Sequence, residues 1–321
     1  MSDAEKKRGS FHSLAWAYLA YLLFVILFGA VVRITGSGNG CGANWPDCHG
    51  EMLMLPDNIQ TAIEYTHRQT SGFALPFALL LGYLGFRRFD AGHLVRKGMV
   101  VSIFFLLVEA GIGARLVLLE LVGLNDSWPR AYWMAAHLTS TYVLTACTAV
   151  VVWASRTSRS PSPSPRGQQR VAGLLLAGLV VLYLVGATGA ITALGDTLYP
   201  VEQLNALDAS LRQKLEADQD SSAHFLRRMR IVHPIVAVLG GIFVGWLGLN
   251  LPKRAGVSED HAAHRWGTRL AILTFAQLCA GVLNIWLSAP GWMQVVHLAL
   301  ACTVWLALVW VGFELWLSAR E

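Results

Sequence analysis

Residues 13–35 read SLAWAYLAYLLFVILFGAVVRIT, and Arg33 is the one charged side chain among them. An apolar run of about 20 residues is long enough to cross a bilayer as an α-helix. Seven further runs of this kind follow, at 65–86, 99–122, 132–154, 171–194, 229–250, 267–288 and 291–314. Strands of a membrane barrel would instead show short alternating segments. The sequence therefore predicts an all-α integral membrane protein with eight transmembrane helices.

The composition of the whole chain agrees with this prediction. Of its 321 residues, 55% are hydrophobic and 14% are charged, whereas a soluble domain usually carries about 25% charged residues. The basic N-terminus precedes a long span without a small-residue cleavage site, so we expect the first span to be retained and not cleaved as a signal peptide.

The formal net charge of +5 follows the predicted topology and does not indicate nucleic-acid binding. Basic residues gather before the first span and after the second, fourth and sixth spans: Lys6, Lys7, Arg8; Arg87, Arg88, Arg96, Lys97; Arg156, Arg159, Arg166, Arg170; Lys253, Arg254, Arg265. The alternate connections are acidic or poor in basic residues. The positive-inside rule then places both termini in the cytoplasm.

The chain is predicted to consist of two related halves. Residues 155–170 (SRTSRSPSPSPRGQQR) cannot form a core and indicate a flexible cytoplasmic linker between 1–154 and 171–321. The first span ends in GAVVRITGSG (29–38) and the fifth in GATGAITALG (186–195), while Glu109-x-x-x-Gly113 and Gln277-x-x-x-Gly281 recur in the third and seventh spans. Four spans per half would insert both halves the same way up, as two pseudo-symmetric four-helix bundles.

Four of the ten histidines lie one in each even-numbered span, near its N-terminal end: His67, His137, His233 and His297. A single such histidine is more often an interfacial or hydrogen-bonded residue than a ligand. Four at a matched depth near the outer surface, two per half, indicate function, because ionisable groups within a membrane generally face the bundle interior.

Paired imidazoles in an apolar bundle are typical of haem ligation. A proton path would spread polar groups across the membrane, and the surroundings lack the clustered carboxylates of di-iron sites and the thiolates of zinc sites. Haem iron accepts two axial nitrogens. Arg68, Arg130 and Arg230 lie near these histidines in the sequence and are candidates to pair with haem propionates. Two pairs predict two haem sites.

Two cysteines and one carboxylate add chemistry to the first half. Cys41 and Cys48 lie in the first outer loop, where a disulfide clamp is the simplest interpretation and a redox-active pair the alternative. Glu64 precedes His67 by three residues and so shares its helix face. It is a candidate general base or stabiliser of positive charge, or else a helix-terminal charge or a hydrogen-bond partner of the ligand. The remaining cysteines, in spans, are assigned to packing.

These residues together resemble the haem A synthase family. The resemblance rests on Cys41, Trp45-Pro46, Cys48 and Gly50, on Glu64-x-x-His67-Arg68, and on the remaining histidines and the duplicated eight-span plan, and it covers nearly the whole chain. Members of that family oxidise the C8 methyl of haem O by two successive hydroxylations, and the gem-diol loses water to give the formyl group of haem A for terminal oxidases.

The resemblance also implies a role for each half. His233 and His297 would be the axial ligands of a permanent b-type haem in 171–321, and His67 and His137 would bracket the substrate haem O in 1–154. Glu64 would act at the reacting carbon, and Cys41 and Cys48 would form the family's loop disulfide.

The expected setting is the bacterial cytoplasmic (inner) membrane, with membrane lipid around the spans and haem O synthase as a candidate partner. The sequence identifies neither an electron acceptor nor an oligomeric state, and homo-oligomers stay open.

Two alternatives and one departure from the family pattern accompany this interpretation. A di-haem b-type cytochrome, passing electrons between a quinone and a periplasmic partner, would need the same four histidines. A transporter is disfavoured, because the spans show few midplane polar groups or Gly/Pro breaks.

Residues 195–228 lack the second cysteine pair that some members carry. Leucines at helical spacing predict instead an amphipathic helix over 203–216 that caps the C-terminal haem site.

Overall fold

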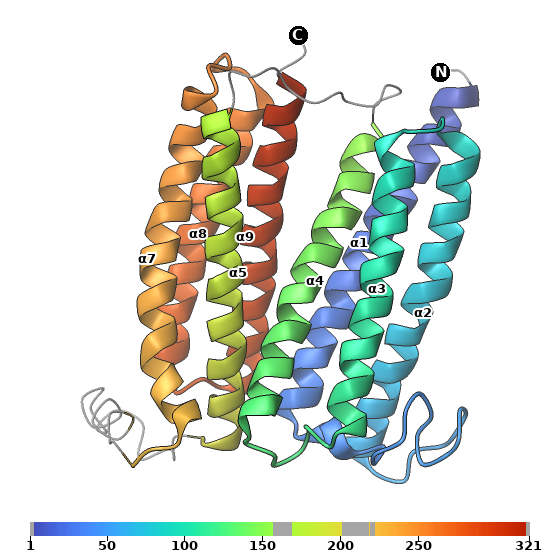
Figure 1. Cartoon of the computed structure of the whole chain (residues 1–321), viewed down its shortest axis with the longest axis vertical. Helices are drawn as coiled ribbons and strands as arrows, with labels where there is room; N and C mark the ends of the chain where they lie inside the picture. Colours follow the sequence, from blue (N-terminus) through green and yellow to red (C-terminus); the bar gives the residue numbers. More distant parts are fainter. Residues whose placement is uncertain (1–2, 157–168, 201–217, 219–221, 319–321) are drawn as a thin grey trace.

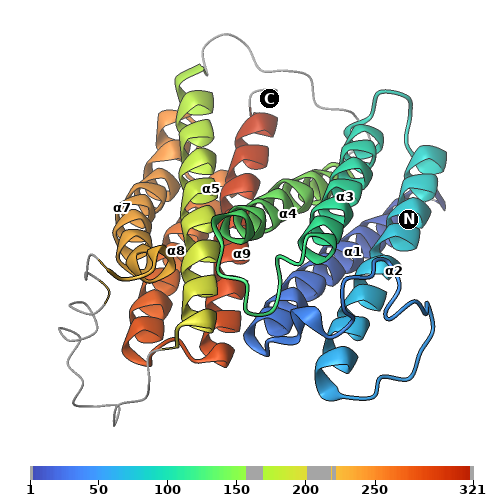
Figure 2. The same ribbon diagram turned by 60° about the horizontal axis from the view of Figure 1, so that its bottom comes forward.

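The structure is a computed structural model that describes residues 3–156, 169–200, 218 and 222–318. One group of helices is α1 (Asp3–Ile34), α2 (Ile59–Arg88), α3 (Leu94–Leu118) and α4 (Trp128–Ala154), with the short 3₁₀ helix η1 (Ser37–Asn39) after α1. The other group is α5 (Gln169–Leu198), α7 (Phe225–Arg254), α8 (Ala262–Trp286) and α9 (Gly291–Ser318). Figures 1 and 2 show the two groups side by side.

Eight described helices are long and apolar enough to cross a membrane, which confirms the all-α multi-span prediction. Both chain termini lie at one end of the bundle, and the long loop after α1 lies at the other (Figure 1). The assignment of the terminal end to the cytoplasm, and the pseudo-symmetry of the halves, stay predictions.

Within each group, the first and third helices each pack against the second and fourth. Thus α2 and α4 both contact α1 and α3, while α7 and α9 both contact α5 and α8. The helices α2 and α4 therefore stand at opposite corners of one bundle, and α7 and α9 at opposite corners of the other. This diagonal arrangement decides which side chains can face each other across a bundle.

The two halves meet mainly through α4, α5, α9 and α1. In the apolar 18-residue stretch of each span, 50% of the residues are buried in α4 and 44% in α9, more than in any other described span. The rings of Tyr142 and Trp305 stack with centroids 4.9 Å apart, and Trp305 Nε1 donates to the carbonyl of Tyr142 at 2.8 Å. Large apolar side chains on the other helices stay exposed, as lipid-facing surfaces require.

Seven of the eight long described helices begin before their predicted apolar runs; α2 does so by six residues, and α4 and α7 by four each. Asn58 caps α2 by accepting from the Thr61 amide at 2.9 Å, and Ser127 accepts from the Arg130 amide to cap α4. The first turns of α2 and α4 are polar, so hydropathy alone does not identify them as helix. Their N-cap side chains satisfy backbone amides that lack partners within the helix.

Two predicted segments fall largely outside the described residues. Most of the 155–170 linker is not described; α4 ends at Ala154 and α5 starts at Gln169, and the division of the chain into two halves stays a prediction. The amphipathic helix predicted over 203–216 lies entirely outside the described residues.

Candidate functional site

The helices α2, α4, α7 and α9 start at the end of the bundle opposite the two termini (Figure 1), and each carries one of the four membrane histidines within its first three turns. His67 lies eight residues after Ile59, His137 nine after Trp128, His233 eight after Phe225 and His297 six after Gly291. At about 1.5 Å per residue, they share one level to within about 5 Å along the helix axes.

The histidines form one pair in each half. His67 and His137, from the diagonal helices α2 and α4, are near enough to interact electrostatically. So are His233 and His297, from the diagonal helices α7 and α9. In the described part of the chain, no three or more His, Cys, Asp and Glu side chains lie together as a potential metal cluster. The available donors are thus two imidazole pairs, one on the diagonal helices of each bundle.

Each imidazole packs against a glycine of the preceding helix. A Cβ on that glycine would lie 3.0 Å from the ring of His233, 3.2 Å from those of His67 and His297, and 3.9 Å from that of His137. The glycines concerned are Gly189, Gly29, Gly281 and Gly113 respectively. At three of the four positions a side chain would crowd the ring, so glycine gives the imidazole its place between the helices.

These contacts change the register of the repeat. The sequence match aligns Gly29 with Gly186, but the glycine that faces a histidine in the fifth span is Gly189. Gly186 instead packs against the ring of Tyr142. Gly186 and Gly189 are three residues apart and lie close to one helix face, so the sequence alone could not show which of them contacts the histidine.

The polar partners of the four rings differ. His137 Nδ1 lies 2.7 Å from Oε2 of Glu109 on α3. His233 Nδ1 lies 3.1 Å from the Thr188 hydroxyl, and His297 Nε2 lies 3.2 Å from the Gln277 amide nitrogen. His67 Nδ1 is buried and has no hydrogen-bond partner among the described residues.

The arrangement fits haem. His137 and His233 have Nδ1 in contact with a polar partner, which leaves Nε2 as the nitrogen for a ligand, whereas Nδ1 is buried without a hydrogen-bond partner among the described residues in both His67 and His297. The glycine contacts leave room for imidazoles in an apolar bundle, and haem requires such a slot with axial nitrogens on both sides. His67 and His137 would hold one haem, and His233 and His297 the other.

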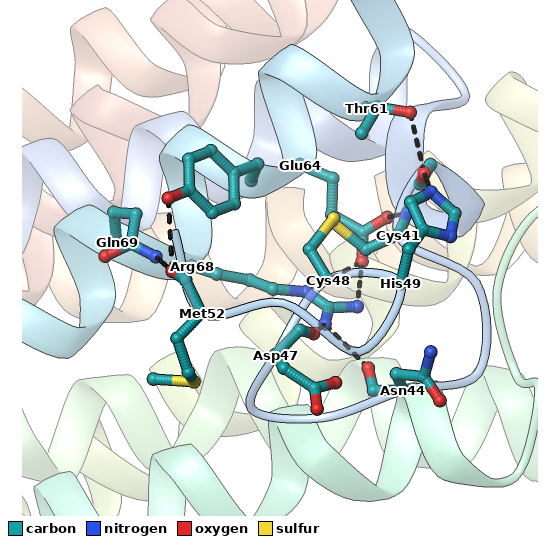
Figure 3. Close-up of a disulfide and its surroundings, with 12 residues drawn as sticks. Cys41, Asn44, Asp47, Cys48, His49, Met52, Thr61, Glu64, Arg68 and Gln69 are labelled. Atoms are coloured by element: carbon teal, nitrogen blue, oxygen red, sulfur yellow. Dashed lines mark hydrogen bonds and ion pairs between the residues drawn. A yellow bond between two sulfur atoms is a disulfide. The ribbon is translucent and has the colours of Figure 1, made fainter. Parts of the chain in front are cut away.

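A disulfide closes the loop between α1 and α2, as predicted. Cys41 and Cys48 are joined with an S–S distance of 2.03 Å, and both side chains are buried. The loop is fastened to α2: Arg68 Nη1 donates to the carbonyls of Asn44 and Asp47 at 2.6 and 2.5 Å (Figure 3). Burial restricts access of thiols to the sulfur atoms, which favours the structural interpretation of the pair over the redox-active one.

Glu64 lies beside this disulfide (Figure 3). It is buried, and its Oε2 accepts from the backbone amide of Cys41 at 2.8 Å. Its Oε1 accepts from Nε and Nη2 of Arg68 at 3.1 and 2.5 Å. Both oxygens are thus engaged, so Glu64 ties the loop to the helix that carries His67. Its role at a reacting carbon stays a prediction.

The three arginines predicted near the histidines are all engaged with protein groups. Besides Arg68, Arg130 donates to the carbonyls of Gly123 and Asn125 at 2.6 and 2.5 Å. Arg230 Nε lies 2.8 Å from Asp196 Oδ1, and its Nη2 donates to the carbonyl of Gly195 at 2.9 Å. Arg68 and Arg130 therefore hold the loop next to their helix, and Arg230 fastens α7 to the last turn of α5. Propionate binding by these arginines stays a prediction.

Arg33 was not predicted as a site residue, although it is the lone charge of the first span. Its Nη1 donates to the Ala193 carbonyl at 2.6 Å and to the Thr197 hydroxyl at 2.5 Å, and its Nη2 donates to Gln294 Oε1 at 2.9 Å. Gln294 lies three residues before His297. Arg33 thus joins α1 of the first half to α5 and α9 of the second. Its charge within an apolar span is the sequence feature that could have identified it, because ionisable residues at membrane depth usually have a function.

A second polar contact joins the halves in the loops at the histidine end. The Tyr199 hydroxyl, just after α5, donates to Asp126 Oδ2 in the α3–α4 loop. This hydrogen bond lowers the pKa of Asp126 and raises the pKa of Tyr199. Ionised Asp126 is therefore part of the contact at neutral pH.

Fold and site together define a multi-pass helical membrane protein with two pairs of inward-facing histidines. The model of the COX15-CtaA family, described as cytochrome oxidase assembly protein, matches residues 12–309. The chain belongs to this family, which is that of the haem A synthases.

Curated relatives carry two different names. A protein of Thermus thermophilus named "Protoheme IX farnesyltransferase" is 41% identical over 298 residues, which cover 93% of this chain and 47% of that protein. The chain thus spans about half the length of that relative. Proteins named "Heme A synthase" are 42% identical over 97 residues in Staphylococcus haemolyticus and 40% identical over 96 residues in Bacillus cereus. These matches cover 30% of this chain and 32% and 31% of the relatives.

Proposed function

We propose that the protein is a haem A synthase, which oxidises the C8 methyl of haem O to a formyl group in two hydroxylations. The observation that carries this proposal is the presence of two imidazole pairs on diagonal helices, with the rings packed against glycines. Membership of the haem A synthase family supports it. When bound, haem supplies the redox chemistry, and the protein supplies ligands, orientation and a water-poor setting.

The proposed division of work gives each half one haem. His233 and His297 hold a resident b-type haem, and His67 and His137 hold the substrate haem O. The asymmetry of the chain supports this division: the disulfide loop with Glu64 adjoins the first pair, whereas the residue three positions before His233 is Arg230.

Glu64 is the proposed general base or charge-stabilising group at the reacting methyl. Its ion pair with Arg68 and its bond to the Cys41 amide fix the carboxylate on the helix turn next to His67. The loop anchored by these bonds would cover the substrate site from the outside. A substrate-induced shift of the loop would release one carboxylate oxygen for proton transfer.

The name of the Thermus relative points to the source of the substrate. A protohaem farnesyltransferase makes a farnesylated haem, and about half of that protein resembles this chain. We propose that the chain receives farnesylated haem from such an enzyme, with the tail entering from the lipid between helices.

The test is acid–acetone extraction and chromatography of haems from the purified full chain, produced in cells that make haem O. Haem B together with haem O, a hydroxylated intermediate or haem A supports the proposal. Haem B alone, at two equivalents, would instead indicate an electron-transfer cytochrome, and protein free of haem would remove the basis of the site.

Two variants test the division of work. In His233→Met, the spectrum of the resident b-type haem should change. In His67→Met, that spectrum should persist while conversion of haem O falls. Equal effects of both substitutions on both readouts would contradict the division.

A further inference from the structure

A buried carboxylate distinguishes the two histidine pairs. Glu109 lies in the membrane-spanning part of α3 and is buried. One of its oxygens is 2.7 Å from His137 Nδ1, and the other accepts from the hydroxyl of Ser140, one turn along α4. An acidic side chain at membrane depth is costly unless partners satisfy it, and here donors reach both oxygens.

The second half has a neutral residue of similar size at the corresponding place. Gln277 on α8 lies 3.2 Å from His297 Nε2, through its amide nitrogen. Both residues precede a histidine-facing glycine by four positions, as Glu109-x-x-x-Gly113 and Gln277-x-x-x-Gly281. The two pairs therefore differ in the charge beside one ligand and in the ring nitrogen that the polar side chain contacts, Nδ1 in His137 and Nε2 in His297.

We propose that Glu109 is a positioning residue that makes His137 a stronger electron donor to haem iron than His297 is in the other half. This inference rests on the proposed function. A carboxylate that accepts from Nδ1–H fixes the tautomer in which Nε2 carries the lone pair, and it raises the basicity of that nitrogen. A stronger donor favours ferric over ferrous iron. The substrate haem would thus be the more easily oxidised of the two.

The competing explanation is that Glu109 only fastens α3 to α4. Replacing it with glutamine separates the two roles, because glutamine keeps the size and the hydrogen-bonding capacity and removes the charge. Helix packing should persist in that variant.

The experiment uses the full chain in detergent, loaded with iron protoporphyrin IX, and measures ferric affinity by titration and the midpoint potential of each haem from absorption spectra. His137→Met and His297→Met assign the two signals to the two halves. Loss of a metal-ligand partner typically weakens metal affinity by about 10-fold or more. We expect Glu109→Gln to weaken ferric binding about tenfold in the first half, which for one electron corresponds to a rise in potential of about 59 mV if ferrous binding is unchanged.

The outcomes separate this inference from the proposed function. An upward shift of the His137 haem in Glu109→Gln, with the potential of the His297 haem unchanged as the internal control, supports it. Unchanged potentials with both haems bound would overturn the role of Glu109 and leave the proposed function standing. Absence of a haem signal that depends on His137 would overturn both.

Discussion

Alanine in place of Gly189 would test the contact between glycine and imidazole directly. The new Cβ would lie 3.0 Å from Cε1 of His233 and 3.5 Å from both ring nitrogens. Contacting carbon atoms are normally about 3.5–4.0 Å apart, so the ring would have to move by about 0.5–1 Å. Gly173 lies on the same helix with nothing within 4 Å of its Cβ position, which makes Gly173→Ala the matched control.

The expected effect on stability is small, and the effect on haem binding is large. Alanine is favoured over glycine in a helix by about 1 kcal/mol, whereas overpacking a tight site costs about 1–3 kcal/mol. Gly189→Ala should therefore destabilise the fold by no more than about 2 kcal/mol. A functional group, however, must be held within about 0.5 Å of its productive position, so a displaced His233 should lose the resident haem.

The assay is haem content per chain, from the pyridine haemochrome spectrum of protein purified in detergent, with elution volume and thermal unfolding as checks on folding. Gly173→Ala should keep its haem, and Gly189→Ala should lose most of it while eluting as a folded species. Full haem content in Gly189→Ala, or equal losses in both variants, would refute the reasoning.

Three further predictions concern the loops at the histidine end. Glu64→Gln should retain haem while haem A formation collapses, measured by haem extraction; loss of haem binding would show that Glu64 supports the ligand instead. Replacing Cys41 and Cys48 with serine should lower the unfolding midpoint, because the closed loop stabilises by about 2–3 kcal/mol, and an unchanged midpoint would contradict this. The hydrogen bond from Tyr199 lowers the pKa of Asp126 in the folded protein. The ionised carboxylate therefore stabilises the fold at pH values above the unfolded-state pKa of about 3.9. This contribution is lost as the pH falls through the lower folded-state pKa. Asp126→Asn should therefore be less stable than the parent chain at pH 6, with the difference shrinking toward pH 3, and a constant difference in unfolding midpoint would argue against it.

Much of the architecture was predictable because it depends on long, local patterns. Apolar runs indicate membrane helices wherever they occur, and one histidine per even-numbered span indicated the pairs. The disulfide followed from two cysteines in one short outer loop. The helix starts were not predictable from hydropathy, because α2 begins in the polar turn after Asn58.

The parts that sequence did not reveal depend on how neighbouring helices are rotated and placed. Glu109 was noted as part of a repeat, but only the packing of α3 on α4 brings it to His137. Arg130 and Arg230 are close to histidines in the sequence, yet a carbonyl of the α3–α4 loop binds Arg130 and the Asp196 carboxylate of α5 binds Arg230. Such pairings leave no periodic signal in a single sequence.

The common depth of the four histidines has a consequence for energy coupling. All four lie six to nine residues inside helices that start at the same end of the bundle. An electron moving from one pair to the other would therefore travel parallel to the membrane plane. Work against a membrane potential amounts to about 2.3 kcal/mol per charge per 100 mV only when charge crosses the bilayer. Electron transfer between the two sites would thus do no work against the membrane potential, and its rate would not depend on the size of that potential.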